Sequence, residues 1–185
     1  MTFSLSARCA RSGAFGIAVS SSSICVAARC GVWARAGAGV VATQNVTDPA
    51  LGALGLDLLA RGMAAQSAIE EMVASNAYPE YRQLAAVDRD GGIAHYSGAK
   101  TLGLNRVAEG SGCVAAGNIL AAEEVPAKMV AAFEASSDHH LAECLLRGLE
   151  AGLEAGGEQG ELRSAGLYVV GSHVFPLVDL RVDWH

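Results

Sequence analysis

The alternation of apolar and polar residues at the start of the chain predicts a β-hairpin. Residues 3–7 alternate with a period of two, residues 8–13 have the composition of a turn, and residues 15–19 resume a strand. Two further short strands are predicted at 32–34 and 39–43. The chain is therefore expected to open with a hairpin that begins at its second residue.

Helical periodicity follows this strand region. Asp48 is a suitable N-cap, and Pro49 occupies the first helical position, where its missing N–H costs nothing. Leucines follow at helical spacing up to Leu59, and a second helix is predicted over residues 65–74, where Ile69 lies on the apolar side. Two consecutive helices are therefore expected after the first strands.

The same alternation of strands and paired helices returns in the rest of the chain. A hairpin is predicted around the turn at 88–92, and residues 113–120 form a further candidate strand. A second pair of helices is predicted over 123–135 and 138–155, the latter capped by Asp138. The last two strands are expected at 165–170 and 177–184.

This order of elements indicates the fold class. Helices that come in consecutive pairs do not fit the strict strand–helix alternation of a parallel sheet. We therefore expect an α+β layered protein, a four-layer αββα sandwich of two antiparallel sheets faced by helix pairs. A length of 185 residues predicts a single domain over residues 1–185.

Composition narrows the classes of partner. Apolar residues make up 51% of the chain and charged residues only 17%, which excludes a disordered protein. The net charge is −6 with no cluster of Lys or Arg, so nucleic acid and anionic membranes are poor partners. No apolar stretch approaches the ~20 residues of a membrane helix. Five cysteines without a CxxC pair, and no signal peptide, favour free thiols and a cytoplasmic location.

Motifs for phosphate and metal binding are absent from the sequence. The glycine spacing at 112–117 resembles a phosphate loop, but Asn118 stands where the lysine must be. His139 and His140 are adjacent and would diverge by about 100° on a helix, so they cannot share an ion. We therefore expect neither a metal nor a cofactor.

Thr2 is the candidate nucleophile. Removal of Met1 would leave a free threonine amine at the start of a buried strand, and an α-amine with a pKa near 8 can act as the base for its own hydroxyl. In a hairpin, the end of the second strand returns beside the start of the first. Residues 20–23 are a run of four serines at that end, and their hydroxyls can orient the amine and the nucleophile.

The chain resembles a known family over nearly its whole length. The motifs that carry the resemblance are Thr2-Phe-Ser-x-x-Ala-Arg8, Gly16-Ile-Ala-Val-Ser-Ser21, Trp33-Ala-Arg-Ala-Gly37, Val41-Ala-Thr-Gln-Asn45, Leu56-Asp-Leu-Leu59, Gly117-Asn118 and Val178-Asp-Leu-Arg-Val-Asp183. Together they are similar to a bacterial family catalogued as DUF1028. A strand that starts at Thr2, the serine run and the layer order also resemble the N-terminal-nucleophile (Ntn) hydrolases.

This resemblance implies an Ntn-type fold and, by analogy of fold, amide hydrolysis. Thr2 would be the nucleophile, and Arg35 could hold a substrate carboxylate. The serine run lacks the acidic and lysine partners that Ntn enzymes often use. The remaining candidates are the polar groups around the nucleophile and the oxyanion donors: Ser20, Ser21, Ser22, Gln44, Asn45 and Asn118.

Two interpretations remain open from the sequence. The chain is either a hydrolase of a small amide, ureido or peptide-like substrate, or a catalytically silent domain that binds a small anionic metabolite near Arg35 or acts as a scaffold. On the first interpretation, the candidate residues should line one pocket. A homodimer is also expected, because Val32 and Trp33 beside a glycine-rich loop suggest apolar surface beyond the needs of one core.

Overall fold

The computed structural model describes residues 2–185. Its strands form two sheets in which every neighbouring pair is antiparallel. The six-stranded sheet has the order β10-β9-β2-β1-β8-β7, and the four-stranded sheet has the order β3-β4-β5-β6. The first contains β1 (Thr2–Arg8), β2 (Phe15–Ser21), β7 (Arg106–Gly110), β8 (Cys113–Asn118), β9 (Ser164–Val170) and β10 (Pro176–Val182). The second contains β3 (Ala34–Arg35), β4 (Gly39–Asn45), β5 (Arg82–Asp88) and β6 (Ile93–Ser97).

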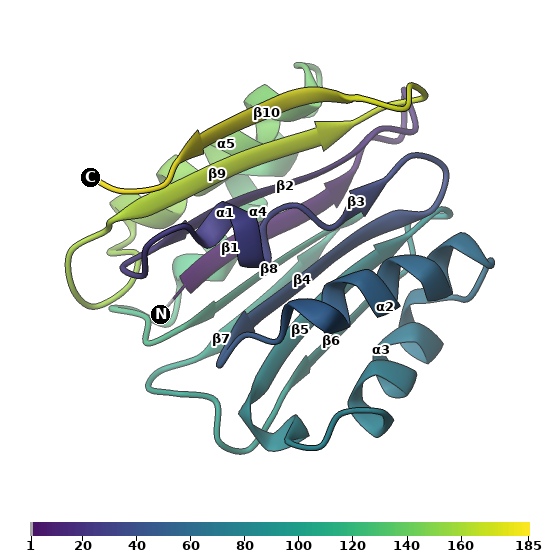
Figure 1. The fold of residues 1–185 in the computed structure, drawn as a ribbon. Helices are drawn as coiled ribbons and strands as arrows, with labels where there is room; N and C mark the ends of the chain where they lie inside the picture. Colours follow the sequence, from purple (N-terminus) through teal and green to yellow (C-terminus); the bar gives the residue numbers. More distant parts are fainter. Residues whose placement is uncertain (1) are drawn as a thin grey trace.

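Helices cover the outer faces of the two sheets (Figure 1). The pair α2 (Pro49–Ala60) and α3 (Ala65–Ala74) packs on the four-stranded sheet, and the pair α4 (Val125–Ala135) and α5 (Leu141–Glu154) packs on the six-stranded sheet. A short helix, α1 (Val26–Cys30), lies beside β2 and β9, and a 3₁₀ turn, η1 (Pro79–Tyr81), precedes β5. The expected α+β class with two antiparallel sheets is confirmed.

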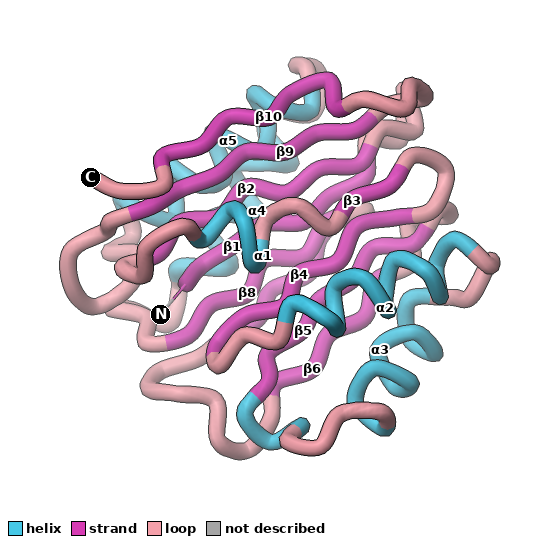
Figure 2. The backbone as a smooth tube through the Cα atoms, viewed as in Figure 1, coloured by secondary structure: helices cyan, strands magenta, loops and turns pink. Residues whose placement is uncertain are grey.

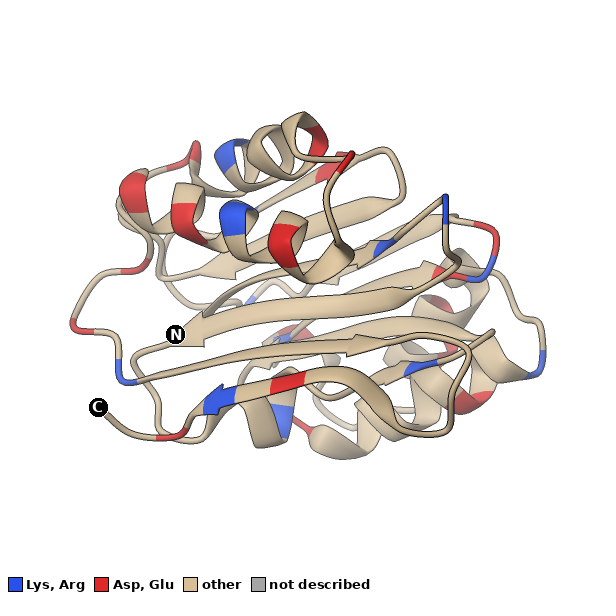
Figure 3. Cartoon of the chain, turned by 90° about the horizontal axis from the view of Figure 1, so that it is seen from above, with Lys and Arg blue, Asp and Glu red and all other residues tan. Residues whose placement is uncertain are grey.

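The core lies in three layers that follow from this stacking. One apolar cluster fills the space between the six-stranded sheet and its helices, around Phe3, Leu5 and Met129. A second cluster lies beneath α2 and α3, and a third, which includes Phe15 and Val40, lies between the two sheets. Figure 2 shows the strands running side by side through the middle of the molecule, and in Figure 3 charged residues are spread over helices and loops. The hairpin that begins at Thr2 is therefore at the centre of the fold.

Local signals in the sequence explain several of these elements. The Asp48 carboxylate accepts the Ala50 N–H at 3.1 Å and caps α2, and Pro49 is its first residue, as predicted. The predicted bounds of α3 are confirmed. The sequence missed α1 and β7, and it placed a strand at 32–34 where the structure has β3 two residues later.

Two expectations based on single residues are corrected. The cap of α5 is His140, whose ring Nδ1 accepts the Ala142 N–H, and not Asp138, whose carboxylate is paired with His139 at 2.6 Å. The Trp33 ring packs on α2 within its own chain: a Cβ atom added at Gly52 would lie 2.4 Å from the ring. Trp33 is thus partly accounted for within its own chain, and the expected dimer stays a prediction.

Across residues 2–185, no helix combines the length and apolar character needed to cross a bilayer.

Candidate functional site

Thr2 begins the central strand of the six-stranded sheet, between β2 and β8. In this register Thr2 is opposite Asn118, while Phe3 is opposite both Ser20 and Gly117. Because side chains alternate along a strand, Thr2 shares a face with Ser4, and Phe3 points the other way. Phe3 packs in the cluster under α4 and α5, so Thr2 belongs to the face that meets the four-stranded sheet.

The hydroxyl of Thr2 has a serine hydroxyl as its neighbour. Thr2 Oγ1 lies 3.2 Å from the Oγ of Ser21, the last residue of β2, and both residues are buried. Ser21 Oγ also accepts the backbone N–H of Ser23 at 3.0 Å, which fixes its rotamer. Thr2 was predicted to lie close to the serine run, and the serine that it contacts is Ser21.

A chain of buried amides links this end of β1 to the four-stranded sheet. Ser4 Oγ donates to Gln44 Oε1 at 2.7 Å, and Gln44 Nε2 donates to Gln83 Oε1 at 2.8 Å. The same Gln83 oxygen accepts from Asn118 Nδ2 at 3.0 Å, and Gln83 Nε2 donates to the Gly117 carbonyl at 3.0 Å. Gln83 thus holds Asn118 in place opposite Thr2, a role that the sequence did not indicate.

Among residues 2–185, three buried polar atoms in the segments around this end of the sheet have no hydrogen-bond partner. They are the hydroxyl of Ser22, Oδ1 of Asn118 and Oε2 of Glu158. A buried polar group without a partner costs about 1–3 kcal/mol, so such atoms are rare in folded proteins and mark strain or a site. Asn118 Oδ1 and Glu158 Oε2 are acceptors, which suits a ligand or group that brings N–H donors.

Glu158 supplies the acidic group that the sequence around the serine run does not contain. It lies in the loop after α5, where a bridge to Leu120 and the bond from Gln159 N–H to the Ile119 carbonyl (2.8 Å) hold the loop beside the end of β8. The second oxygen of the carboxylate, Oε1, accepts the backbone N–H of Ser22. Burial raises the pKa of Glu158, and the bond from Ser22 opposes this rise. A lone glutamate in a Gly-rich loop gave no signal in the sequence.

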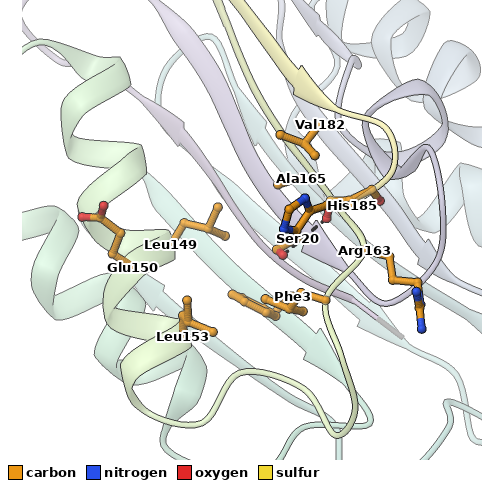
Figure 4. A pocket seen from close by; sticks show the side chains of 11 residues that line it. Phe3, Ser20, Leu149, Glu150, Leu153, Arg163, Ala165, Val182 and His185 are labelled. Atoms are coloured by element: carbon orange, nitrogen blue, oxygen red, sulfur yellow. Dashed lines mark hydrogen bonds between the residues drawn. The ribbon is translucent and has the colours of Figure 1, made fainter.

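Ser20 is not on the same face as Thr2, contrary to expectation. Its hydroxyl donates to the Ser164 carbonyl at 3.4 Å and lines a groove of about 450 Å³ between α5 and the β9–β10 hairpin (Figure 4). Phe3, Leu149 and Leu153 give this groove an apolar wall. The physical reason is the strand period of two, which sends Ser20 and Ser21 to opposite faces of β2.

Arg35 does not join the other candidates, which corrects the expectation of one shared pocket. It pairs with Gly39 at the start of β4, whereas Gln44, which bonds to Ser4, is five residues further on, or about 17 Å at 3.3 Å per residue. Its guanidinium donates to Asp57 on α2 at 2.9 Å. Arg35 therefore braces the opposite end of the sheet.

Gln44 and Asn45, the other candidate donors, bond within the protein. Gln44 belongs to the amide chain described above. Asn45 adopts a positive φ of 71°, and its side chain donates to the Tyr81 carbonyl at 2.6 Å and accepts from Leu102 N–H at 3.2 Å. The side chains of both residues are therefore engaged in structural hydrogen bonds, and neither is placed to act as an oxyanion donor.

The described residues contain no group of three or more His, Cys, Asp or Glu side chains suited to a metal ion. The arrangement is that of an α+β protein of two facing antiparallel sheets, with a hydroxyl and carboxylate cluster at the start of its central strand. The chain belongs to the family of unknown function DUF1028, whose model matches residues 2–185.

Comparison with solved structures agrees with this family. The crystal structure of protein SPO2555 from Silicibacter pomeroyi, also described as DUF1028, superposes with a TM-score of 0.91 and is 31% identical. The match covers 100% of this chain and 79% of that chain. No curated protein matches the chain.

Proposed function

We propose that this protein is a hydrolase of a small amide, ureido or peptide-like substrate and that Thr2 is its nucleophile. The observation that carries the proposal is the position of the Thr2 hydroxyl, 3.2 Å from Ser21 Oγ and opposite Asn118. Asn118 Oδ1 and the Oε2 of Glu158, whose other oxygen bonds to Ser22, have no hydrogen-bond partner among residues 2–185. Ordinary packing leaves few such atoms together. Unpartnered acceptors around a potential nucleophile indicate a binding site in which a further group donates hydrogen bonds to them.

That group would be the α-amine of Thr2 itself. Removal of Met1 would free this amine, whose ordinary pKa near 8 suits a base at neutral pH. An amine brings N–H donors, and Asn118 Oδ1 and Glu158 Oε2 are buried acceptors without a partner in the described part of the chain. We expect these oxygens to hold the amine so that its lone pair faces the Thr2 hydroxyl.

The reaction would be acyl transfer in two stages. Thr2 Oγ1 attacks the substrate carbonyl carbon while the amine takes the hydroxyl proton, and the amine then returns this proton to the leaving nitrogen as the C–N bond breaks. Water hydrolyses the resulting ester by the same exchange of protons and regenerates Thr2. Ser21 would orient the Thr2 hydroxyl, and the carboxylate of Glu158 would orient the amine.

The fold adds support by analogy. Two facing antiparallel sheets between two helix pairs, with the N-terminal strand at the centre of one sheet, resemble the αββα layering of the Ntn hydrolases. Fold alone does not fix an activity, so the residues of the site decide between functions. Binding of an anionic metabolite at Arg35 has less support, because that guanidinium is engaged by Asp57. Five free cysteines favour a reducing compartment, and we propose the cytoplasm.

The test is covalent labelling of Thr2. Intact mass first establishes a preparation that lacks Met1. This protein is then treated with a β-lactone electrophile, which an N-terminal threonine opens to form an ester, and the peptide that carries the label is sequenced. We expect label on Thr2, none on Thr2→Ala, and retained label on Thr2→Ser. Ser111→Ala, which removes an exposed hydroxyl from the β7–β8 turn, is the control for a neutral substitution.

The opposite result would overturn the proposal. Absence of label from a folded protein that lacks Met1, or equal labelling of Thr2→Ala, would mean that Thr2 is not a nucleophile. Turnover is then followed with a panel of amide substrates, in which Thr2→Ala should lose activity without loss of stability.

A further inference from the structure

The strand β10 forms an edge of the six-stranded sheet that no other strand within residues 2–185 covers. It pairs with β9 on one side only, and it is the last strand of the sheet (Figure 1). Residues 178–182 pair with β9 in unbroken register and contain no proline, glycine or lysine. Natural sheets usually protect an edge with such residues or cover it, because free N–H and C=O groups attract a further strand.

Other edges in the described part of the chain are shorter or engaged. The edge strand β3 has two residues, and β6 and β7 have five each, against seven in β10. His95 on β6 lies 3.6 Å from Glu109 on β7, so these two edges face one another across the sheets. The edge at β10 is therefore the longest one that the described residues offer to a partner strand.

The side chains of β10 are unusually apolar for an exposed strand. Leu180 is 62% exposed and Val182 is 49% exposed. Val178 packs on the cluster beneath α4 and α5, which places Val178, Leu180 and Val182 on the helix side of the sheet. The opposite face of the strand carries Asp179 and Arg181, charges of opposite sign two residues apart. Within its own chain Arg181 donates to the exposed Asp183 at 2.8 Å, a surface pair that Asp179 of a second copy would join or replace.

We infer that β10 pairs with the β10 of a second copy of this chain, antiparallel, about a two-fold axis at Leu180. In this register Val178 lies opposite Val182, and Asp179 lies opposite Arg181 of the second copy, each pair occurring twice. The strand is thus complementary to itself in both charge and apolar character, as an isologous interface requires. The result is a continuous twelve-stranded sheet across the dimer.

Other registers that keep the apolar faces on one side are less favourable. A two-fold at Arg181 puts Arg181 opposite itself and Asp179 opposite Asp183. A two-fold at Asp179 puts that carboxylate opposite itself. Like charges directly opposite one another destabilise a strand pair. A two-fold at Val182 leaves residues 178–181 opposite positions beyond the strand, and a two-fold at Val178 does the same to residues 181 and 182. Only the register at Leu180 pairs residues 178–182 with one another and avoids like charges.

The neighbouring groove suits this arrangement. Val182 lines the apolar groove together with Leu149 and Leu153 of α5, and Leu153 is 53% exposed (Figure 4). A two-fold axis perpendicular to the sheet places the α5 helices of both copies on the same side. Apolar side chains of α5 and β10 would then flank the Leu180 pair. The interface would bury these side chains in addition to forming backbone hydrogen bonds between the strands.

A charge-swap experiment tests this interface. Sedimentation velocity between 1 and 100 µM should show the wild-type chain at twice its 18.9 kDa mass. Asp179→Arg and Arg181→Asp each place like charges opposite one another twice, and we expect each to weaken the dimer about tenfold or more. The double variant D179R/R181D restores opposite charges and should recover the dimer. Leu180→Lys places two lysines at the axis and should give a monomer.

Matched controls separate register from net charge. Asp90→Arg and Lys128→Glu change the charge by the same amounts at exposed positions away from β10 and should leave the dimer intact. Circular dichroism checks that each variant is folded. In addition, amide exchange in residues 178–182 should slow as protein concentration rises.

Three outcomes would overturn the inference: a wild-type monomer at 100 µM, a dimer that survives Leu180→Lys, or a double variant that fails to recover while both controls dimerise. None of these results bears on Thr2, which lies on β1, three strands further into the sheet.

Discussion

Thr2 Oγ1 lies 3.2 Å from Ser21 Oγ, although the two residues are separated by a whole hairpin. The antiparallel register of β1 and β2 creates this contact, and the turn at residues 9–14 sets that register. The backbone N–H of Ser23 donates to Ser21, so the serine hydroxyl is held in a fixed position beside the threonine. A fixed hydroxyl can orient its neighbour without rearranging during a reaction.

Ser21→Ala should therefore slow acyl transfer, and loss of the bond from the Ser23 N–H should cost about 1–3 kcal/mol of stability. Loss of one orienting hydrogen bond, worth about 1.4 kcal/mol, predicts a decrease of about tenfold in kcat. The measurement is the rate of β-lactone labelling or of amide turnover. Ser23→Ala, in the same serine run, should keep the wild-type rate. A fully active Ser21→Ala protein would show that this hydroxyl plays no part.

Glu158 predicts a dependence of stability on pH. Burial raises its pKa in the folded protein above the ordinary value of 4.5, so the folded state binds this proton more tightly than the unfolded state. The resulting stabilisation is complete below about pH 4.5 and is lost as the pH rises through the raised pKa of the folded state. At neutral pH, the ionised carboxylate of Glu158 therefore lowers the free energy of unfolding relative to its protonated form.

Urea denaturation of wild type and Glu158→Gln checks this prediction. The difference in the free energy of unfolding, variant minus wild type, should increase from pH 4 to pH 7.5, because only the wild type carries the buried charge. Glu161→Gln, an exposed glutamate three residues away, should give a flat difference. A flat difference for Glu158→Gln as well would contradict the assigned burial.

Gln83 should be a major determinant of stability, since three groups rely on it. Gln83→Leu would leave Gln44 Nε2, Asn118 Nδ2 and the Gly117 carbonyl without their partner. We expect a loss of about 2–4 kcal/mol in the free energy of unfolding. The exposed Gln66→Ala should cost less than about 0.5 kcal/mol. Equal costs for both variants would show that the amide chain is dispensable.

The cysteines should differ in reactivity. Burial, together with the neighbouring Glu134, raises the pKa of Cys113 to about 12. Burial also raises that of Cys9, but hydrogen bonds from Ser12 and Arg11 outweigh it and leave the pKa below the ordinary value. Because the thiolate is the reactive form, iodoacetamide at pH 8 should modify Cys9 well before Cys113. Peptide mapping during a time course measures the order, and faster modification of Cys113 would contradict it.

The sequence by itself determined the local elements of this protein. Adjacent residues encode the period of two in β1 and β2, and the Asp48-Pro49 signal starts α2 through contacts within one turn. The paired helices excluded a parallel sheet, and the position of Thr2 at the start of a hairpin was visible from its neighbours. These features depend on interactions between residues close in the chain, so their pattern is readable without the fold.

Only the tertiary structure decided which side chains meet. Glu158 reaches Ser22 across 136 residues, and no local pattern records that contact. Arg35 and Gln44 are close in sequence but lie at opposite ends of the four-stranded sheet, because the strand between them carries the chain about 17 Å. The stacking of one sheet on the other, and the side of the sheet on which each residue falls, fix the site. Both arise from the packing of the whole chain.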